Sequence, residues 1–436
     1  MNSIHPAPGE PGFGTGASLF IDPRTCIDCG ACADICPVDA AKPASHSAPE
    51  DVVRNAAYFA DTEPLDATDL DSWEPVSYQT WGGGPRRVLV VGAGPAGMYA
   101  TRELLLRTTA EITVVDRLDH VGGLVRYGVA PDHPQTKQIV ETFERIIHHR
   151  RVRWLPGTDA RTLLSIGQAD SHGPHAARGR VGGVGGTRVV DGAGLGGGAG
   201  RRGVLGGFDA VVHAVGARRS RRLGIPGEDA ACTAEDFVAW YNGRPGAVTP
   251  PGLVGPRAVV VGNGNVALDI ARVLLSDEQQ VRGMEVPPDV RRTLAASGIK
   301  EVVLLGRRGP EHAAYTEPAL QELRAMAGDR VELRYHARPT AWTSEGLTLD
   351  TGETIEAGNL FTAIGFEGRP IDGLPFDADR GIVPNVRGAV VDRPGHYVAG
   401  WIKRGARGGI GVNKACAQET VKTLVNASRA AASPGS

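Results

Sequence analysis

Two glycine-rich turns, each between a predicted strand and a predicted helix, limit what this chain can fold into more than any other feature. The first turn follows an apolar run at residues 86–91 and has glycines at Gly92, Gly94 and Gly97. In this pattern the first glycine makes a tight turn, the second lets the backbone approach a phosphate group, and the third lets helix and strand pack closely. The following residues are predicted to be helical through Leu106, so the turn opens a strand–turn–helix unit.

An acidic residue lies where such a unit needs one. A second strand is predicted at residues 111–115, and Asp116 follows it, 19 residues after Gly97. An acid at this strand end can hydrogen-bond the hydroxyl groups of a ribose, while a diphosphate lies at the helix N-terminus. The combination predicts a dinucleotide site; the alternative is a tight turn that binds no ligand.

The second turn lies between a predicted strand at residues 257–261 and a predicted helix at residues 266–275, with alanine in place of the third glycine. The next predicted strand, residues 301–305, is followed by Arg307 and Arg308. An acid there would repel a 2′-phosphate, whereas two arginines can hold it through forked, charge-assisted hydrogen bonds. This difference predicts NADP at the second turn and FAD at the first, and a solvated arginine pair is the alternative. The second turn consists of Gly262, Asn263, Gly264, Asn265, Val266 and Ala267.

Strands and helices alternate around both turns. Further strand-like runs occur at residues 208–216, 359–365 and 396–400, and the last helix is predicted at residues 415–427. Repeated strand–helix–strand units indicate parallel sheets with helices on both faces. We therefore expect an α/β fold with two Rossmann-like, doubly wound dinucleotide-binding domains. Two such sites in one chain imply electron transfer between a nicotinamide and a flavin.

Four of the six cysteines form one short run near the N-terminus. Cys26, Cys29, Cys32 and Cys36, with a proline after the last, have the spacing of a bacterial ferredoxin cluster, whereas zinc sites favour paired knuckles. We expect a short ferredoxin-like segment with an iron–sulfur cluster of the 4Fe-4S type. In two-cluster ferredoxins the cysteine before proline binds the other cluster. The run thus offers three ligands, unless Cys36 becomes the fourth or the true start lies upstream.

The other two cysteines argue against a disulfide as the electron acceptor. A disulfide reductase needs a cysteine pair beside the flavin, and Cys232 and Cys416 are far apart in the sequence. A flavin can accept two electrons and release them singly, so a one-electron iron–sulfur acceptor fits. The expected partners are NADPH and a ferredoxin or another iron–sulfur electron carrier.

Charge and hydropathy argue against nucleic acid and membranes as partners. The formal net charge is -2, and no stretch of 18 apolar residues occurs. With no leader pattern at the start, we expect a cytoplasmic protein. Residues 171–207 are dominated by Gly, Arg and Ala without an apolar period, which predicts a disordered insertion. The alternative, an RNA-binding segment, lacks aromatic residues for base stacking.

Several long strings make residues 86–426 similar to the adrenodoxin reductase family of ferredoxin–NADP reductases. The actinobacterial branch with a fused N-terminal ferredoxin is the nearest resemblance. The strings are Gly94 to Tyr99, Gly123 to Pro134, Gly262 to Asp269, Gly306 to Pro310 and Gly400 to Gly405.

The resemblance implies a discontinuous FAD domain with the NADP domain inserted in it. The expected boundaries are a partial ferredoxin-like segment at 1–50, a linker at 51–85, the FAD domain at 86–217 and 363–426, the NADP domain at 218–362 and a tail at 427–436.

The resemblance also implies site residues. The residues implied for FAD are Gly92, Gly94, Ala96, Gly97, Asp116, Leu124, Trp401, Gly408, Gly409 and Ile410. Those implied for NADP are Asn263, Gly264, Asn265, Val266, Arg307, Arg308 and Gly408. His133 is implied to pair with Glu322 near the flavin and the nicotinamide, although the sequence alone would make them a loop residue and a solvated helix residue.

The expected activity is that of a ferredoxin–NADP(+) reductase, with electrons passing from NADPH to FAD and then singly to an iron–sulfur acceptor. One alternative is the flavin and iron–sulfur subunit of the glutamate synthase small-subunit type, which typically has more cysteines before its FAD turn. Another is a poorly active FAD-binding electron-carrier module.

Overall fold

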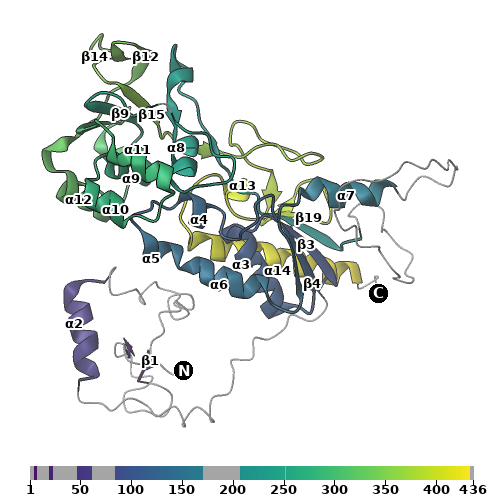
Figure 1. Ribbon diagram of the computed structural model, residues 1–436. Coiled ribbons are helices and arrows are strands. Elements are labelled where there is room, and N and C mark those ends of the chain that lie inside the picture. Colours follow the sequence, from purple (N-terminus) through teal and green to yellow (C-terminus); the bar gives the residue numbers. More distant parts are fainter. Residues whose placement is uncertain are drawn as a thin grey trace, which may run out of the picture. The chain divides into compact units, whose positions relative to one another are not determined.

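A computed structural model describes residues 4–6, 19–22, 47–60, 84–169, 207–250 and 252–432 of the chain (Figure 1). The chain divides into two compact units, Met1–Tyr78 and Gln79–Ser436. The cysteine run at residues 26–36 lies outside the described residues, as does nearly all of the expected insertion at 171–207.

The described residues of the first unit include a two-stranded antiparallel sheet and the helix α2 (Pro49–Tyr58). The strands are β1 (Ile4–His5) and β2 (Phe20–Ile21). The Asn55 side chain of α2 accepts from the backbone N–H of Ile21 and donates to its carbonyl, both at 2.8 Å. Residues 51–58 therefore form a helix rather than the expected linker, because Asn55 and the ring of Tyr58, stacked on Phe20, tie them to the strands.

The first turn opens a seven-stranded sheet in the order β17-β18-β19-β6-β3-β4-β5. From β19 to β5 all neighbours are parallel, and β17 and β18 add an antiparallel edge. The strands are β3 (Arg87–Val91), β4 (Glu111–Val115), β5 (Val152–Leu155), β6 (Ala210–His213), β17 (Asn385–Val386), β18 (Ala389–Val390) and β19 (His396–Val398).

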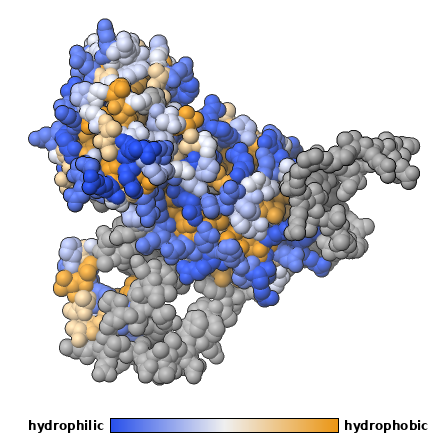
Figure 2. Space-filling view, in the orientation of Figure 1, coloured by the Kyte–Doolittle hydropathy of each residue, from blue (hydrophilic) through white to orange (hydrophobic). Residues whose placement is uncertain are grey.

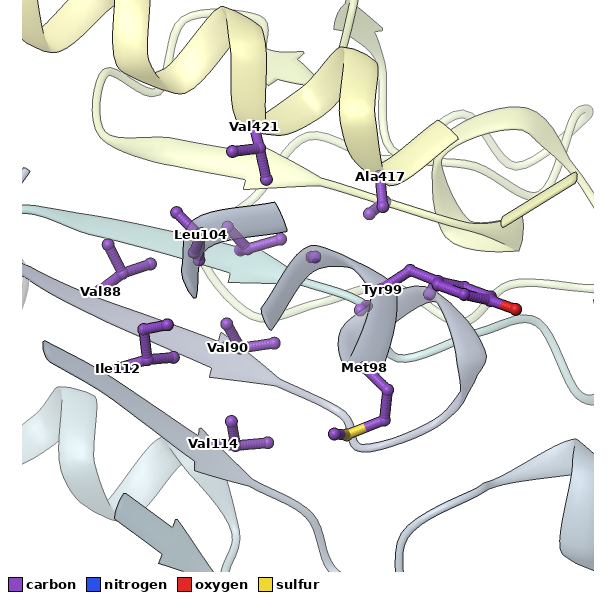
Figure 3. Close-up of a cluster of buried hydrophobic side chains, with 14 of the residues drawn as sticks. Val88, Val90, Met98, Tyr99, Leu104, Ile112, Val114, Ala417 and Val421 are labelled. Carbon is purple, nitrogen blue, oxygen red and sulfur yellow. The ribbon is translucent and has the colours of Figure 1, made fainter. Parts of the chain in front are cut away.

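Helices cover both faces of this sheet. On one face, α3 (Pro95–Arg107) packs against α14 (Val412–Ala432) and α6 (Ile139–Ile147). Figure 3 shows this core, where Val90 of β3 and Leu104 of α3 lie with Val421 of α14. On the other face, Leu163 and Leu164 of α7 (Ala160–Ala169) pack on a smaller apolar cluster. Helix α14 also includes residues 427–432, which were expected to form part of a tail.

The second turn opens a five-stranded parallel sheet in the order β11-β10-β9-β15-β8. Its strands are β8 (Cys232–Thr233), β9 (Arg257–Val261), β10 (Glu301–Leu305), β11 (Val331–Arg334) and β15 (Asn359–Thr362). The helices of this domain are α8 (Ala234–Tyr241), α9 (Asn265–Leu274), α10 (Glu278–Gly283), α11 (Pro288–Ala295) and α12 (Glu317–Ala327). The expected α/β class with two doubly wound domains is confirmed.

Two small sheets were not predicted. One is antiparallel, formed by β12 (Pro339–Thr343), β13 (Gly346–Leu349) and β14 (Thr354–Ile355). The other pairs β7 (Arg219–Ser220) with β16 (Phe366–Glu367). Both were missed because their strands are short and do not alternate with helices.

Within the described residues, no helix is both long and apolar enough to cross a bilayer. Hydrophilic side chains predominate on the coloured face in Figure 2, with smaller hydrophobic groups between them.

Candidate functional site

The first turn requires glycine at two of its positions. Gly92 has φ +105, and a β-carbon on it would stand 2.5 Å from the carbonyl oxygen of Ala214. A β-carbon on Gly97 would stand 1.8 Å from the carbonyl oxygen of Gly92. Gly94 is the N-cap of α3 and supplies no side-chain cap, which leaves N–H groups of the first helical turn for an external anion.

Asp116 is hydrogen-bonded to the turn itself. Its Oδ2 accepts from the backbone N–H of Ala93 at 2.8 Å, and its Oδ1 accepts from the N–H of Leu118 at 2.9 Å. The carboxylate is thus fixed at the carboxyl end of β4, beside the N-terminus of α3, where ligands bind in open parallel sheets.

Two other segments approach the start of α3. A β-carbon on Gly123 would stand 2.8 Å from the Cα of Gly94, and one on Gly400 would stand 2.5 Å from the Cβ of Ala96. Leu124 begins α4 (Leu124–Gly128), directly after Gly123. The structure therefore brings the expected FAD residues of three separate segments to one place.

The third of these segments is held by its own hydrogen bonds. Trp401 begins α13 (Trp401–Arg404), and its indole Nε1 donates to the carbonyl of Gly408 at 3.1 Å. The Asn413 side chain donates to the carbonyl of Gly409 at 3.1 Å. Ile410 packs against the core of the first domain. Gly408 and Gly409 remain exposed, so their backbone is open to a ligand.

The second turn resembles the first at its first two glycine positions. Gly262 has φ +143, and a β-carbon there would stand 2.2 Å from the carbonyl oxygen of Ala363. Gly264 is the N-cap of α9 and again supplies no side-chain cap. Asn263 accepts two backbone N–H groups through its carbonyl, and the Asn265 side chain accepts the N–H of Thr316 at 2.8 Å. Helix α9 therefore also presents its N-terminus to an anion.

Arg307 and Arg308 follow β10 and lie beside this turn. A β-carbon on Gly306, which precedes them, would stand 3.0 Å from the side-chain Nδ2 of Asn263. Both arginines are exposed, and their side chains form no hydrogen bond or ion pair within the described residues. Their guanidinium groups are thus available to a phosphate.

His133 and Glu322 come together at the junction of the two domains. The Nε2 of His133 lies 3.9 Å from the Oε2 of Glu322, too far for a hydrogen bond. The side chain of Arg272 contacts both: its Nη2 lies 2.8 Å from His133 Nε2, and its Nη1 lies 3.8 Å from Glu322 Oε2.

Two aspartates complete this charged cluster. Asp132 binds Nε and Nη2 of Arg272, and Asp269 Oδ1 lies 2.8 Å from the same Nη2. Burial lowers the pKa of Arg272, but the hydrogen bond that Arg272 donates to Asp132 and the charge of Asp269 raise it by more, so the net pKa lies above its ordinary value. Sequence reasoning did not single out Arg272, although an arginine inside the apolar helix VALDIARVLL was a signal.

The expected metal ligands Cys26, Cys29, Cys32 and Cys36 lie outside the described residues. Cys232 and Cys416 are both buried and form no disulfide. Burial raises the pKa of the Cys232 thiol to about 12, which makes it a poor nucleophile at neutral pH. These two thiols therefore do not supply the redox pair of a disulfide reductase.

The two turns suit two dinucleotides that differ at the ribose: one with free hydroxyl groups and one with a 2′-phosphate. At the first glycine of each turn, a β-carbon would overlap with a backbone carbonyl oxygen. The helix that follows each turn begins without a side-chain cap. The first turn has a carboxylate beside it, and the second has two guanidinium groups that no described residue pairs with.

Comparisons with known proteins agree with a two-dinucleotide oxidoreductase. Residues 86–431 match the family described as pyridine nucleotide-disulphide oxidoreductase, and residues 19–42 match the 4Fe-4S binding domain. A probable ferredoxin/ferredoxin–NADP reductase of Mycobacterium tuberculosis is 34% identical over 98% of this chain and 80% of its own length. A mitochondrial NADPH:adrenodoxin oxidoreductase of Arabidopsis thaliana is 31% identical over 78% of this chain and 82% of its own length.

A solved structure agrees with these sequence matches. FprA of Mycobacterium tuberculosis, determined in complex with NADPH, superposes with a TM-score of 0.65 at 31% identity. The alignment covers 81% of this chain and 87% of FprA.

Proposed function

This chain belongs to the pyridine nucleotide-disulphide oxidoreductase family, as one of its ferredoxin–NADP reductases, and we propose how its residues perform that reaction. The protein is an oxidoreductase that transfers electrons between NADPH and a ferredoxin. It does so through FAD, and its N-terminal 4Fe-4S match adds an iron–sulfur cluster to its cofactors.

One observation carries the assignment of the two sites. Both turns have a first glycine with positive φ and a glycine N-cap before the helix, but Asp116 lies at the first and Arg307 with Arg308 at the second. A carboxylate suits ribose hydroxyls and repels a 2′-phosphate, whereas guanidinium groups bind that phosphate in a forked geometry. FAD therefore occupies the first turn and NADPH the second.

The FAD site is built from three segments of the first domain. The N–H groups at the start of α3 hold the diphosphate, and Asp116 binds the ribose. Leu124, Trp401 and the backbone at residues 408–410 line the rest of the cofactor. FAD, when bound, supplies the change from two-electron to one-electron chemistry.

The NADPH site is built from the second turn and the two arginines. Residues 263–266 hold the diphosphate at the start of α9, and Arg307 and Arg308 bind the 2′-phosphate. His133 and Glu322 lie at the domain junction, where they orient the nicotinamide end and keep water from it. Arg272 contacts His133 at 2.8 Å, and its Nη1 lies 3.8 Å from the carboxylate of Glu322.

The acceptor is an iron–sulfur protein. Cys26, Cys29, Cys32 and Cys36 would hold an iron–sulfur cluster, and this cluster or a separate ferredoxin would supply the one-electron acceptor. We place the enzyme in the cytoplasm, because a cluster of cysteines that bind iron suits a reducing compartment.

Steady-state oxidation of NADPH tests this assignment. Ferricyanide as acceptor reports the flavin step, and a 2[4Fe-4S] bacterial ferredoxin with cytochrome c as final acceptor reports electron transfer to an iron–sulfur protein. We expect NADPH-dependent turnover with both. Turnover with ferricyanide alone would instead support an electron-carrier module or a subunit that needs its own partner, as in the glutamate synthase type.

A further inference from the structure

We propose that Arg272 is a positioning residue that fixes the proton of His133 on Nδ1 and couples His133 to the NADPH-binding domain. This inference rests on the proposed role of His133 at the nicotinamide end of the site. It concerns the orientation of that side chain and its hydrogen-bonding state, which can be measured without turnover.

The guanidinium of Arg272 is buried, with only 2% of the residue exposed. Its Nε hydrogen-bonds Asp132, which leaves the two hydrogens of Nη2 for other acceptors. The two shortest Nη2 contacts are His133 Nε2 and Asp269 Oδ1, both at 2.8 Å. Asp132 Oδ1 is a weaker third acceptor at 3.2 Å. One hydrogen of Nη2 is therefore directed at the imidazole.

This contact determines the tautomer of His133. Arginine has only donors, so Nε2 of His133 must be the acceptor. The neutral ring then carries its proton on Nδ1 and offers an N–H donor there. The carboxylate of Glu322 lies 3.9 Å from the same Nε2. While Nε2 accepts a hydrogen bond from Arg272, it carries no hydrogen and cannot donate one to Glu322. Arg272 thus prevents a hydrogen bond between His133 and Glu322. His133 remains a donor through its Nδ1–H, and Glu322 remains an acceptor through its carboxylate.

The same contact crosses between the two domains. Asp132 and His133 lie in the loop that follows α4 in the first domain, whereas Asp269 and Arg272 lie on α9 in the second. A second link lies nearby, where Lys137 Nζ donates to Asn242 Oδ1 at 2.6 Å. A shift of α9 relative to the first domain would therefore move the donor away from His133. The tautomer of His133 therefore depends on how the two domains are arranged.

The cluster has spare hydrogen-bonding capacity that a purely structural ion pair would not need. Arg272 Nη1 and the hydroxyl of Tyr241 are both buried and have no hydrogen-bond partner among the described residues. Nη1 faces Glu322 at 3.8 Å. The carboxylate of Glu322 is thus an acceptor that lies just beyond hydrogen-bond distance of Nη1.

Arg272→Lys is the variant that tests the proposal. A lysine side chain keeps the positive charge among three carboxylates, but its Nζ lies near the position of the arginine Cζ, one bond short of the Nη2 that contacts His133, and it lacks the guanidinium fork. Arg272→Met removes every donor and serves as a second variant. Arg282→Gln is the matched control, because Arg282 also pairs with an acid on its own helix, Glu278, but at the exposed surface.

The readout is the pair of ring nitrogen shifts of His133 in the FAD-loaded full chain labelled with ¹⁵N-histidine. The signals are assigned by their loss in His133→Gln. We expect the Nδ1–H pattern in the wild type and in Arg282→Gln. In Arg272→Lys we expect the Nε2–H pattern that free imidazole favours, with Glu322 as the new acceptor. Retention of the Nδ1–H pattern in Arg272→Lys would overturn the proposal, whether or not Arg272→Met folds.

A double-mutant cycle on the rate of flavin reduction by NADPH gives an independent measure. If Arg272 acts through His133, Arg272→Lys should lower this rate on the order of tenfold in the wild type and hardly at all in His133→Gln. Equal effects in both backgrounds would show a merely structural arginine. If His133→Gln alone had no effect, the proposed role of His133 would fail while the tautomer result still decided the role of Arg272.

Discussion

Gly400 and Ala96 approach so closely that a β-carbon on Gly400 would stand 2.5 Å from the Cβ of Ala96. Gly400 precedes α13 in the last third of the chain, and Ala96 lies in the first turn of α3. Two segments far apart in the sequence therefore meet at the N-terminus of α3, where we propose that the diphosphate of FAD binds.

We predict that Gly400→Ala weakens FAD binding, because the added methyl must push α13 away from α3. Overpacking of this kind costs about 1–3 kcal/mol. Gly373→Ala is the matched control: Gly373 has the same φ of +78 but no atom within 4 Å of its β-carbon position. FAD release, followed by flavin fluorescence, should be faster in Gly400→Ala only. Equal loss in both variants would point to backbone strain instead of the contact with Ala96.

Replacing Arg307 and Arg308 together with glutamine should raise the KM for NADPH by a hundredfold or more. Each arginine can donate to the 2′-phosphate, and a hydrogen bond to a charged group contributes about 1.5–3 kcal/mol. NADH lacks this phosphate, so its weak reaction and the flavin spectrum should hardly change. Steady-state kinetics with both nucleotides measure the effect, and Arg282→Gln again serves as an exposed control. Equal loss with NADPH and NADH would make the pair structural.

A buried histidine pair should make the stability of the protein depend on pH. His213 on β6 is 2% exposed, and its Nε2 lies 3.0 Å from Nδ1 of His396 on β19. Burial, and next the charge of His396, lower the pKa of His213 to about 3 from 6.5. Between these values the unfolded chain binds more protons than the folded one. The free energy of unfolding should therefore fall by about 1.4 kcal/mol for each unit of pH decrease below about 6.5.

His213→Phe should remove most of this slope. The measurement is the melting temperature of the FAD-loaded protein between pH 7 and pH 5, compared with His148→Gln, whose side chain is 74% exposed. We expect a shallower decline in His213→Phe and the wild-type decline in His148→Gln. The same slope in all three proteins would assign the pH dependence to other groups.

The iron–sulfur cluster should be labile and present in less than one copy per chain. One cysteine run supplies an incomplete ligand set for the two-cluster fold. Iron and acid-labile sulfide analysis after anaerobic reconstitution, with electron paramagnetic resonance of the reduced protein, measures occupancy and cluster type. Cys36→Ser should abolish the cluster if Cys36 acts as the fourth ligand. Two stable clusters per chain would show that this ligand count is wrong.

The sequence predicted what is encoded locally. Both strand–turn–helix units were found because their glycines, strand and helix are contiguous, and β4, β9 and β10 begin and end where expected. The cluster around Arg272 could not be found this way, because Asp132 and Arg272 are 140 residues apart and meet only through the packing of two domains.

Two other differences concern α2 and the β12–β14 sheet, and they have different causes. Helix α2 was assigned to a linker because its sequence is polar, and the contact from Asn55 to Ile21 that supports it spans 34 residues. The sheet β12–β14 turns at Gly346, where φ is +135, and has no helix to mark it. A long-range contact thus supports α2, whereas the β12–β14 sheet forms by local antiparallel pairing of short strands.

An anaerobic titration with NADPH tests the central claim most directly. We predict that NADPH bleaches the visible absorbance of the bound FAD, and that oxidised 2[4Fe-4S] ferredoxin, added next, restores it. This sequence of changes would show that one chain accepts electrons from NADPH and delivers them to an iron–sulfur protein. A flavin that stays oxidised with NADPH, or that stays reduced after ferredoxin is added, would contradict the account.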